Sequence, residues 1–129
     1  VSIVGPKTLI PKGIEKTSVK VYFTPEEALG GADVIMLLRI QKERQEQMLF
    51  PSLREYSRLY GLNKKLLSLA RKDALIMHPG PVNRGIEIES YLADGEQAVI
   101  REQVTNGVAI RMALLFLLLE GEDAHEMVD

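Results

Sequence analysis

Short hydrophobic runs alternate with turn-forming residues along the chain, and this pattern predicts strands separated by helices. Residues 1–4, 19–23 and 33–39 are typical of strands, because they are rich in β-branched and aliphatic side chains. Residues 74–77 predict a fourth strand. It must end at the His-Pro-Gly-Pro sequence over 78–81, because proline donates no backbone N–H to a helix or a β-ladder. We therefore expect a stiff loop after this strand.

Helix-capping residues predict the helices between these strands. Thr24 as N-cap, Pro25 as first helical residue and Glu27 three residues after the cap predict a capping box at the start of a short helix. Residues 51–61 carry apolar side chains at helical spacing and predict a second helix. The leucine-rich segment that Asn63 caps, ending near position 72, should be a third helix that covers the sheet.

The carboxy-terminal part of the chain predicts one long helix over residues 97–120, with Asn106-Gly107 as a candidate break. Between Val108 and Leu119 the only polar side chain is Arg111, so we expect this helix to be buried on several sides. A membrane-spanning helix needs roughly 20 apolar residues, and this twelve-residue run contains an arginine. We therefore expect no membrane span.

Alternating strands and helices are typical of an α/β domain with a mainly parallel sheet. We expect a three-layer α/β/α, Rossmann-like arrangement in which the strands ending at Arg39 and Met77 are neighbours. Parallel strands place their carboxyl ends at one edge, where open α/β sheets bind ligands. Arg39 and the loop at Pro79 and Gly80 should therefore open on one crevice.

Composition narrows the class of protein. The chain has 129 residues, of which 46% are hydrophobic and 26% charged, as in a single globular domain. Its 16 basic and 18 acidic residues are interspersed, which argues against nucleic-acid binding. The absence of cysteine excludes disulfides, thiolate metal sites and a cysteine nucleophile, and agrees with a cytoplasmic location. The only histidines are His78 and His125, so we expect no metal site. A start at Val1 rather than methionine indicates processing, cleavage or a fragment.

The candidate chemistry lies at the ends of two strands. Arg39 ends an apolar strand, and its guanidinium is suited to planar, bidentate recognition of a carboxylate. Gln41 can add an amide donor on the same side, and Glu43 can hold the side chain of Arg39. The loop at Pro79 offers carbonyl acceptors with fixed directions, which suit an NH₂ group. A histidine at a strand end, such as His78, is more often structural than catalytic.

Two blocks of sequence resemble one family. Residues 78–85, His-Pro-Gly-Pro-Val-Asn-Arg-Gly, closely resemble the signature loop of aspartate carbamoyltransferases, and residues 38–44 resemble that family's aspartate-binding segment. The blocks stand in the family's order and at about its separation, and the resemblance extends from Val1 to about Gly121. It implies that residues 1–129 are part of the carboxy-terminal aspartate-binding domain. That part lacks the domain's first strand-helix unit, so its sheet is incomplete at the amino-terminal side, and it lacks the carbamoyl-phosphate domain.

The resemblance also implies roles for individual residues. Residues that match Arg39 and Gln41 bind the carboxylates of aspartate in the family. Those that match Glu43 and Arg44 orient the site and form the ion pairs of domain closure. From residue types alone, positions 42–44 are better explained as a solvated helix face with paired charges.

The implied reaction is carbamoyl transfer from carbamoyl phosphate to the amino group of L-aspartate, giving N-carbamoyl-L-aspartate and phosphate in pyrimidine biosynthesis. The family's residues at Pro79 and Gly80 accept hydrogen bonds from the carbamoyl NH₂ through their backbone carbonyls, and many members carry leucine at the Gly80 position. No cofactor or covalent intermediate is implied. The phosphate-binding Ser-Thr-Arg-Thr-Arg motif is missing from the sequence, so we expect this chain alone to be inactive and assign it no catalytic residue. Arg84 receives no role.

The resemblance implies a homotrimer, with dihydroorotase or regulatory chains as candidate further partners. In the family the last helix crosses to the amino-terminal domain, so residues 108–119 should be partly bare in this chain alone. Two alternatives stay open. One is a non-catalytic binding module that kept the fold. The other is a sibling enzyme acting on ornithine, although the loop of that enzyme typically carries a cysteine, which this chain lacks.

Overall fold

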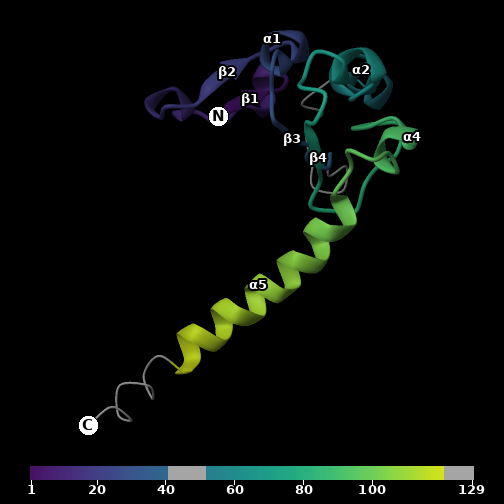
Figure 1. Cartoon of the computed structure of the whole chain (residues 1–129). Coiled ribbons are helices and arrows are strands. Elements are labelled where there is room, and N and C mark those ends of the chain that lie inside the picture. Colours follow the sequence, from purple (N-terminus) through teal and green to yellow (C-terminus); the bar gives the residue numbers. More distant parts are fainter. Residues whose placement is uncertain (41–51, 121–129) are drawn as a thin grey trace.

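Four short strands form two parallel pairs in the computed structural model, which describes residues 1–40 and 52–120 (Figure 1). The strands are β1 (Ser2–Val4), β2 (Lys20–Tyr22), β3 (Val34–Met36) and β4 (Leu75–Met77). All four predicted strands are present, each shorter than its hydrophobic run. The α/β class and the parallel sense of the strands are confirmed. Within the described residues the strands form two separate two-stranded sheets instead of one continuous sheet.

The pairing of β3 with β4 confirms that the two candidate motifs share an edge. Ile35 lies opposite Ile76 in a parallel ladder, and the N–H of Leu37 donates to the carbonyl of Met77 over 2.9 Å. Both strands therefore end at the same edge of the sheet. The segment containing Ala98 adds an isolated parallel bridge to Ile76.

Helical segments connect the strands and precede the long terminal helix. They are η1 (Lys7–Leu9), η2 (Ile14–Lys16), α1 (Pro25–Leu29), α2 (Leu53–Tyr60), α3 (Lys64–Leu67), α4 (Ser90–Ala93) and α5 (Ile100–Glu120). The predicted cap of α3 is confirmed, because Oδ1 of Asn63 accepts from the N–H of Leu66 over 2.9 Å. That helix ends at Leu67, earlier than predicted. The chain turns there, and the N–H of Arg71 donates to the carbonyl of Ala32 over 3.1 Å.

The capping-box prediction for α1 was wrong. Thr24 occupies the N-cap position, but its side chain makes no capping hydrogen bond. Pro25 begins the helix instead, since its fixed φ suits the first turn and it has no N–H that needs a cap.

Aliphatic side chains from several elements form one core between the helices and the β3–β4 pair. The buried members are Leu29, Ile35, Leu62, Leu66, Ile76, Ile88 and Leu92. Each such side chain contributes roughly 1.5–3 kcal/mol to stability when it is fully buried. This core therefore fixes the two strands whose ends carry the candidate chemistry.

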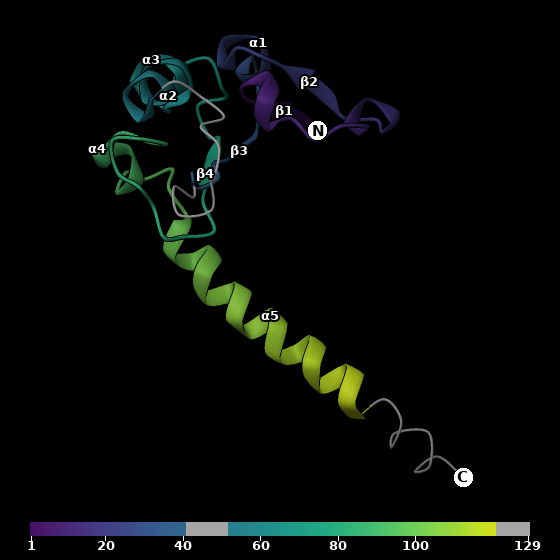
Figure 2. The same ribbon diagram turned by 180° about the vertical axis from the view of Figure 1, so that it is seen from behind.

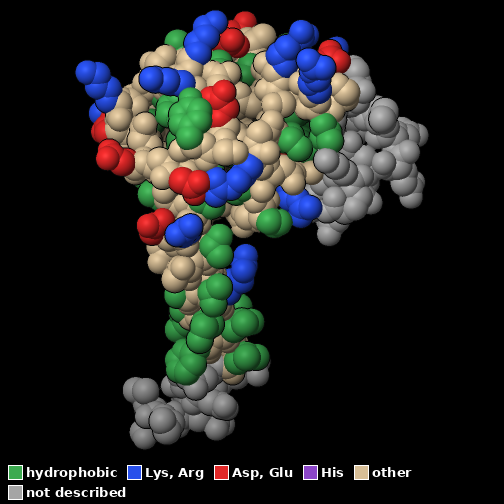
Figure 3. All heavy atoms as spheres, turned by 90° about the vertical axis from the view of Figure 1, so that its right-hand side faces the viewer, with side chains coloured by type: hydrophobic (Ala, Val, Ile, Leu, Met, Phe, Trp, Pro, Cys, Tyr) green, Lys and Arg blue, Asp and Glu red, His purple; other side chains and the backbone are tan. Residues whose placement is uncertain are grey.

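The last helix, α5, extends away from the rest of the chain (Figures 1 and 2). It runs unbroken through Asn106-Gly107 for 21 residues. Its apolar side chains are bare, for example Leu114 at 53% and Leu118 at 76% exposure, and Figure 3 shows hydrophobic side chains gathered along it. The expected burial on several sides therefore does not occur within this chain, while the expectation of a partly bare helix is confirmed. By length and composition alone, residues 100–119 could cross a membrane.

Candidate functional site

The candidate site lies at the edge where β3 and β4 both end. Arg39 follows β3 and is half-buried, and Pro79 and Gly80 follow β4, with Pro79 exposed. Gly80 has a φ of 69°, in the left-handed region that favours glycine. The structure thus brings a guanidinium and a carbonyl-rich loop to one edge, as the sequence predicts.

A buried carboxylate connects the two strand ends. Glu87 is 2% exposed, and its Oε1 accepts from the N–H of Ile40 over 2.8 Å and from Nδ2 of Asn83 over 2.7 Å. Its Oε2 accepts from the N–H of Asn83 over 3.0 Å, and Nδ2 of Asn83 also approaches the carbonyl of Ile40 at 3.3 Å. Because Ile40 follows Arg39 and Asn83 follows the proline loop, Glu87 fixes the spacing of the two motifs. We call Glu87, Ile40 and Asn83 the Glu87 link.

Sequence reasoning missed the Glu87 link. It assigned no role in the candidate site to residues 86–89. The one available signal was the charge itself, because an acidic residue between Ile86 and Ile88 must find donors if its neighbours are buried.

His78 is a buried structural histidine. It is fully buried, and its Nδ1 accepts from the N–H of Gly80 over 2.9 Å, so the neutral ring carries its proton on Nε2. Within the described residues, Nε2 makes no hydrogen bond. Burial lowers the pKa of His78 below its ordinary value of 6.5; the Glu87 carboxylate opposes this shift, and the positive charge of Arg39 adds to it. A neutral imidazole is the form that the Gly80 hydrogen bond requires.

Arg84 serves a neighbouring helix. Its Nη1 donates to the carbonyl of Ser90 over 3.0 Å, and its Nη2 donates to Oδ1 of Asp94 over 2.8 Å. The Arg84 hydrogen bond lowers the pKa of the exposed Asp94 carboxyl below its usual range. Arg84 therefore ties the loop to α4 and its C-cap.

Three predicted site residues, Gln41, Glu43 and Arg44, lie outside the described residues, so their roles stay predictions. Within residues 1–40 and 52–120, no group of three histidine, aspartate or glutamate side chains could hold a metal ion.

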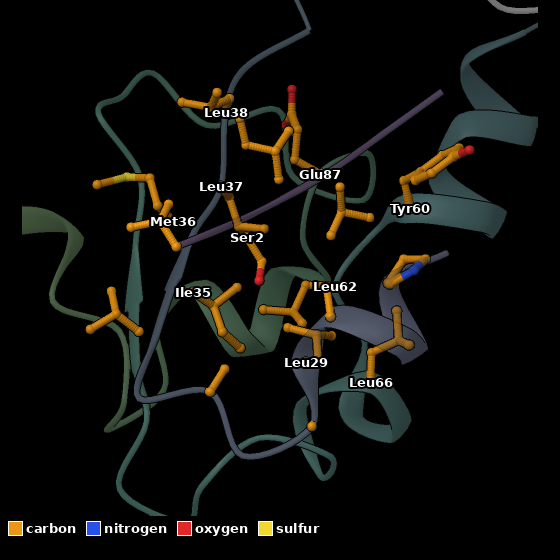
Figure 4. Close-up of a pocket in the computed structure, with 18 of the residues that line it drawn as sticks. Ser2, Leu29, Ile35, Met36, Leu37, Leu38, Tyr60, Leu62, Leu66 and Glu87 are labelled. Carbon is orange, nitrogen blue, oxygen red and sulfur yellow. The ribbon is translucent and has the colours of Figure 1, made fainter. Parts of the chain in front are cut away.

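A cavity also lies between the two sheets. A cavity of about 730 Å³ opens between β1 and β3, and apolar side chains such as Leu62 and Leu66 line it (Figure 4). Arg39, Pro79 and Gly80 are not among its lining residues. It is therefore the gap between the two sheets, and at one end it reaches Leu38 and Glu87, which adjoin the candidate site.

Polar groups enter this cavity at one side. Glu87 lies there together with Tyr56 and Tyr60, whose rings stack with centroids 5.3 Å apart. Burial, followed by the charge of Glu87 and by Tyr60, raises the pKa of Tyr56 to about 12. The phenol of Tyr56 therefore stays protonated at neutral pH.

Comparison with known proteins gives one family for almost the whole chain. The model of the aspartate/ornithine carbamoyltransferase Asp/Orn-binding domain matches residues 2–118. The aspartate carbamoyltransferase catalytic subunit of Desulforamulus reducens is 66% identical over 122 residues, which cover 95% of this chain and 39% of that subunit. The chain thus spans about two-fifths of the length of the curated relatives that it matches.

Solved structures show the same fold. An ornithine carbamoyltransferase from Campylobacter jejuni superimposes with a TM-score of 0.75 at 25% identity, covering 94% of this chain and 43% of that one. An aspartate transcarbamoylase from Trypanosoma cruzi, in complex with carbamoyl aspartate and phosphate, gives a TM-score of 0.69 at 23% identity, covering 88% and 38%. Both matches cover less than half of the solved chain, as the sequence comparison does.

Proposed function

We propose a function from one premise: this chain belongs to the aspartate/ornithine carbamoyltransferase family, whose Asp/Orn-binding domain it matches over residues 2–118. The whole protein transfers a carbamoyl group from carbamoyl phosphate to L-aspartate and releases phosphate, a step of pyrimidine biosynthesis. The observation that carries this proposal is the meeting of Arg39 with the Pro79-Gly80 loop at one sheet edge. The 66% identity to an aspartate carbamoyltransferase supports aspartate over ornithine as the acceptor.

In the proposed mechanism this chain positions both substrates. The guanidinium of Arg39 holds a carboxylate of aspartate through paired N–H groups, and it repels the cationic side chain of ornithine. The carbonyls of Pro79 and Gly80 accept from the carbamoyl NH₂, which orients the carbonyl carbon towards the α-amino group. The neutral amine forms a C–N bond to the carbamoyl carbon, the C–O bond to phosphate breaks, and the proton that the amine loses passes to the departing phosphate. No covalent intermediate with the protein forms. Such positioning can lower a barrier by roughly 7–11 kcal/mol.

Gln41, Glu43 and Arg44 complete this side of the site in the proposal. Gln41 adds a donor to the aspartate carboxylates, while Glu43 and Arg44 hold Arg39 and form the ion pairs of domain closure. Groups from the rest of the polypeptide bind the phosphate, and no cofactor is required.

We further propose that residues 1–129 form an incomplete aspartate-binding domain. The cavity between β1 and β3 supports this division, because one strand-helix unit inserted there would join the two pairs into one parallel sheet. The bare side of α5 supports an amino-terminal carbamoyl-phosphate domain as its neighbour. The proposed assembly is a homotrimer in the cytoplasm, with dihydroorotase or regulatory chains as further candidate partners and without nucleic acid or membrane.

Steady-state kinetics of the complete polypeptide with Arg39→Ala test the function. We expect kcat/KM for aspartate to fall by about 10- to 100-fold, the range for a lost charge-assisted hydrogen bond, while binding of carbamoyl phosphate changes little. Arg39→Lys should recover only part of the loss, because lysine keeps the charge without the planar fork.

The controls separate the alternatives. Arg58→Ala, which removes an exposed arginine of α2, should leave both substrates unaffected. Ornithine offered in place of aspartate should not be carbamoylated, and residues 1–129 alone should show no turnover. Unchanged aspartate kinetics in the Arg39→Ala variant would show that Arg39 does not bind the acceptor.

A further inference from the structure

Two glutamines hold the two ends of β4. At the amino end, Nε2 of Gln97 donates to the carbonyl of Ala74 over 2.9 Å. At the carboxyl end, Oε1 of Gln103 accepts from the N–H of His78 over 2.9 Å. Both glutamines are half-buried, but only Gln103 touches the segment that leads into the proline loop. Loss of the Gln97 hydrogen bond should therefore affect the strand alone. Loss of the Gln103 hydrogen bond should also affect the candidate site.

The hydrogen bonds around His78 decide which way the loop carbonyls face. The segment His78-Pro79-Gly80 has two backbone N–H groups, because proline has none. The N–H of His78 donates to Gln103, and the N–H of Gly80 donates to Nδ1 of His78. Both donors are thus bonded within the chain. What the segment can present to a ligand is its carbonyl oxygens.

Gln103 also reaches the neighbouring strand. Its Nε2 lies 3.9 Å from the sulfur of Met36, the last residue of β3. The side chain therefore contacts the ends of both strands whose following residues carry the candidate chemistry. Gln103 lies in the first turns of α5. The next residue of that helix, Val104, also lies close to the loop, because a Cβ atom at Gly80 would be 3.7 Å from Cγ2 of Val104.

We propose that Gln103 is a positioning residue for the donor substrate: by holding the N–H of His78 it sets the direction of the Pro79 and Gly80 carbonyls that receive the carbamoyl NH₂. This inference rests on the proposed function. It makes α5 part of the substrate site through one side chain, which acts through the backbone of His78.

The test compares three single variants of the complete polypeptide. Gln103→Met keeps the length of the side chain and removes the acceptor, whereas Gln103→Glu keeps an acceptor for the His78 N–H. Gln97→Met is the control at the other end of the same strand, where it removes the hydrogen bonds from Nε2 to the carbonyls of Ala74 and Lys72. For each variant one measures thermal unfolding, KM for carbamoyl phosphate, KM for aspartate, and amide hydrogen exchange of the peptide containing His78.

We expect Gln103→Met to raise KM for carbamoyl phosphate by roughly 5- to 20-fold, as an unpaired N–H would, and to change KM for aspartate less than about 2-fold. Gln103→Glu should restore most of the loss. Gln97→Met should lower the melting temperature without changing either KM. Hydrogen exchange at His78 should become faster only in Gln103→Met.

The opposite results overturn the proposal. The first is an unchanged KM for carbamoyl phosphate in Gln103→Met. The second is an equal rise in the KM values for both substrates that Gln97→Met reproduces. Either result would show that the Gln103 hydrogen bond is merely structural. If Gln103→Met does not fold, a Gln103→Glu variant with altered KM for carbamoyl phosphate and unaltered exchange at His78 also overturns it. Absence of carbamoyl transfer in the unsubstituted protein would instead refute the proposed function, while the exchange measurement would still report the His78 hydrogen bond.

Discussion

The Glu87 link buries a charged side chain, whereas residues 108–119 of α5 expose apolar ones. Glu87 is a charge removed from water, and its oxygens accept from the backbone and side chain of Asn83 and from the backbone of Ile40, all within this chain. Residues 108–119 of α5 are mostly apolar and remain exposed, with Leu117 at 66% exposure. The Glu87 link thus buries a charged group together with its hydrogen-bond donors, whereas residues 108–119 leave apolar side chains exposed.

This difference separates what the chain can build alone from what it cannot. A buried carboxylate is tolerated only when donors are already in place, so the Glu87 link must form together with the core around Ile88. A helix with many exposed apolar side chains is typical of a surface that a partner covers. The geometry of the two strand ends is therefore a property of this chain, whereas the apolar side chains of residues 108–119 are left exposed by it.

Breaking the Glu87 link should have the larger effect. Glu87→Ala leaves the buried N–H of Ile40 and the partly buried N–H of Asn83 without an acceptor, and the expected loss of unfolding free energy is about 3–5 kcal/mol. Urea unfolding of the complete polypeptide measures it. Glu89→Ala is a matched control, because Glu89 is exposed and accepts from the N–H of Lys64 over 3.3 Å. Equal losses in the two variants would mean that the Glu87 link does not hold the strand ends.

The second prediction concerns the exposed apolar side chains of residues 108–119 in α5. Leu117→Gln should change the stability of residues 1–129 alone by less than about 0.5 kcal/mol, because this side chain is already in water. In the complete polypeptide it should cost roughly 1.5–3 kcal/mol, the value of one buried leucine. Leu62→Ala, in the core at 2% exposure, should destabilise both forms. A Leu117→Gln variant that is neutral in both forms would show that nothing covers this face.

The strands, and the shared edge that they form, could be predicted because local pattern carries that information. Short aliphatic runs and the two prolines after residue 77 define where strands begin and end, and the parallel sense follows from the helices between them. Asn63 was a correct cap for the same reason: its partner, the N–H of Leu66, is three residues away. The four residues of α4 are too few for a periodic signal, and that helix was not predicted.

The supports of the candidate site could not be predicted, because they join residues far apart in the sequence. Glu87 meets the backbone of Ile40 from 47 positions away, and Gln103 meets the backbone of His78 from 25 positions away. A backbone N–H is present at almost every position, so no residue type marks it as a partner. Arg39 and Pro79 could be identified as candidate site residues from their chemistry alone. The groups that hold them could be identified only from the three-dimensional structure.

The smallest expected effect is a pH dependence at His78, next to the Glu87 link. Its pKa is lowered in the folded protein, chiefly by burial, so as the pH falls through about 6.5 the unfolded chain takes up a proton before the folded chain does. Stability should therefore be complete above pH 6.5 and decline below it, until the folded pKa is reached. A proton on Nδ1 would also remove the acceptor for Gly80. His78→Asn supplies an amide oxygen near the place of Nδ1 and does not titrate, so it should flatten this decline in melting temperature. Identical pH profiles for His78→Asn and the unsubstituted protein would show that His78 is not held neutral by its burial.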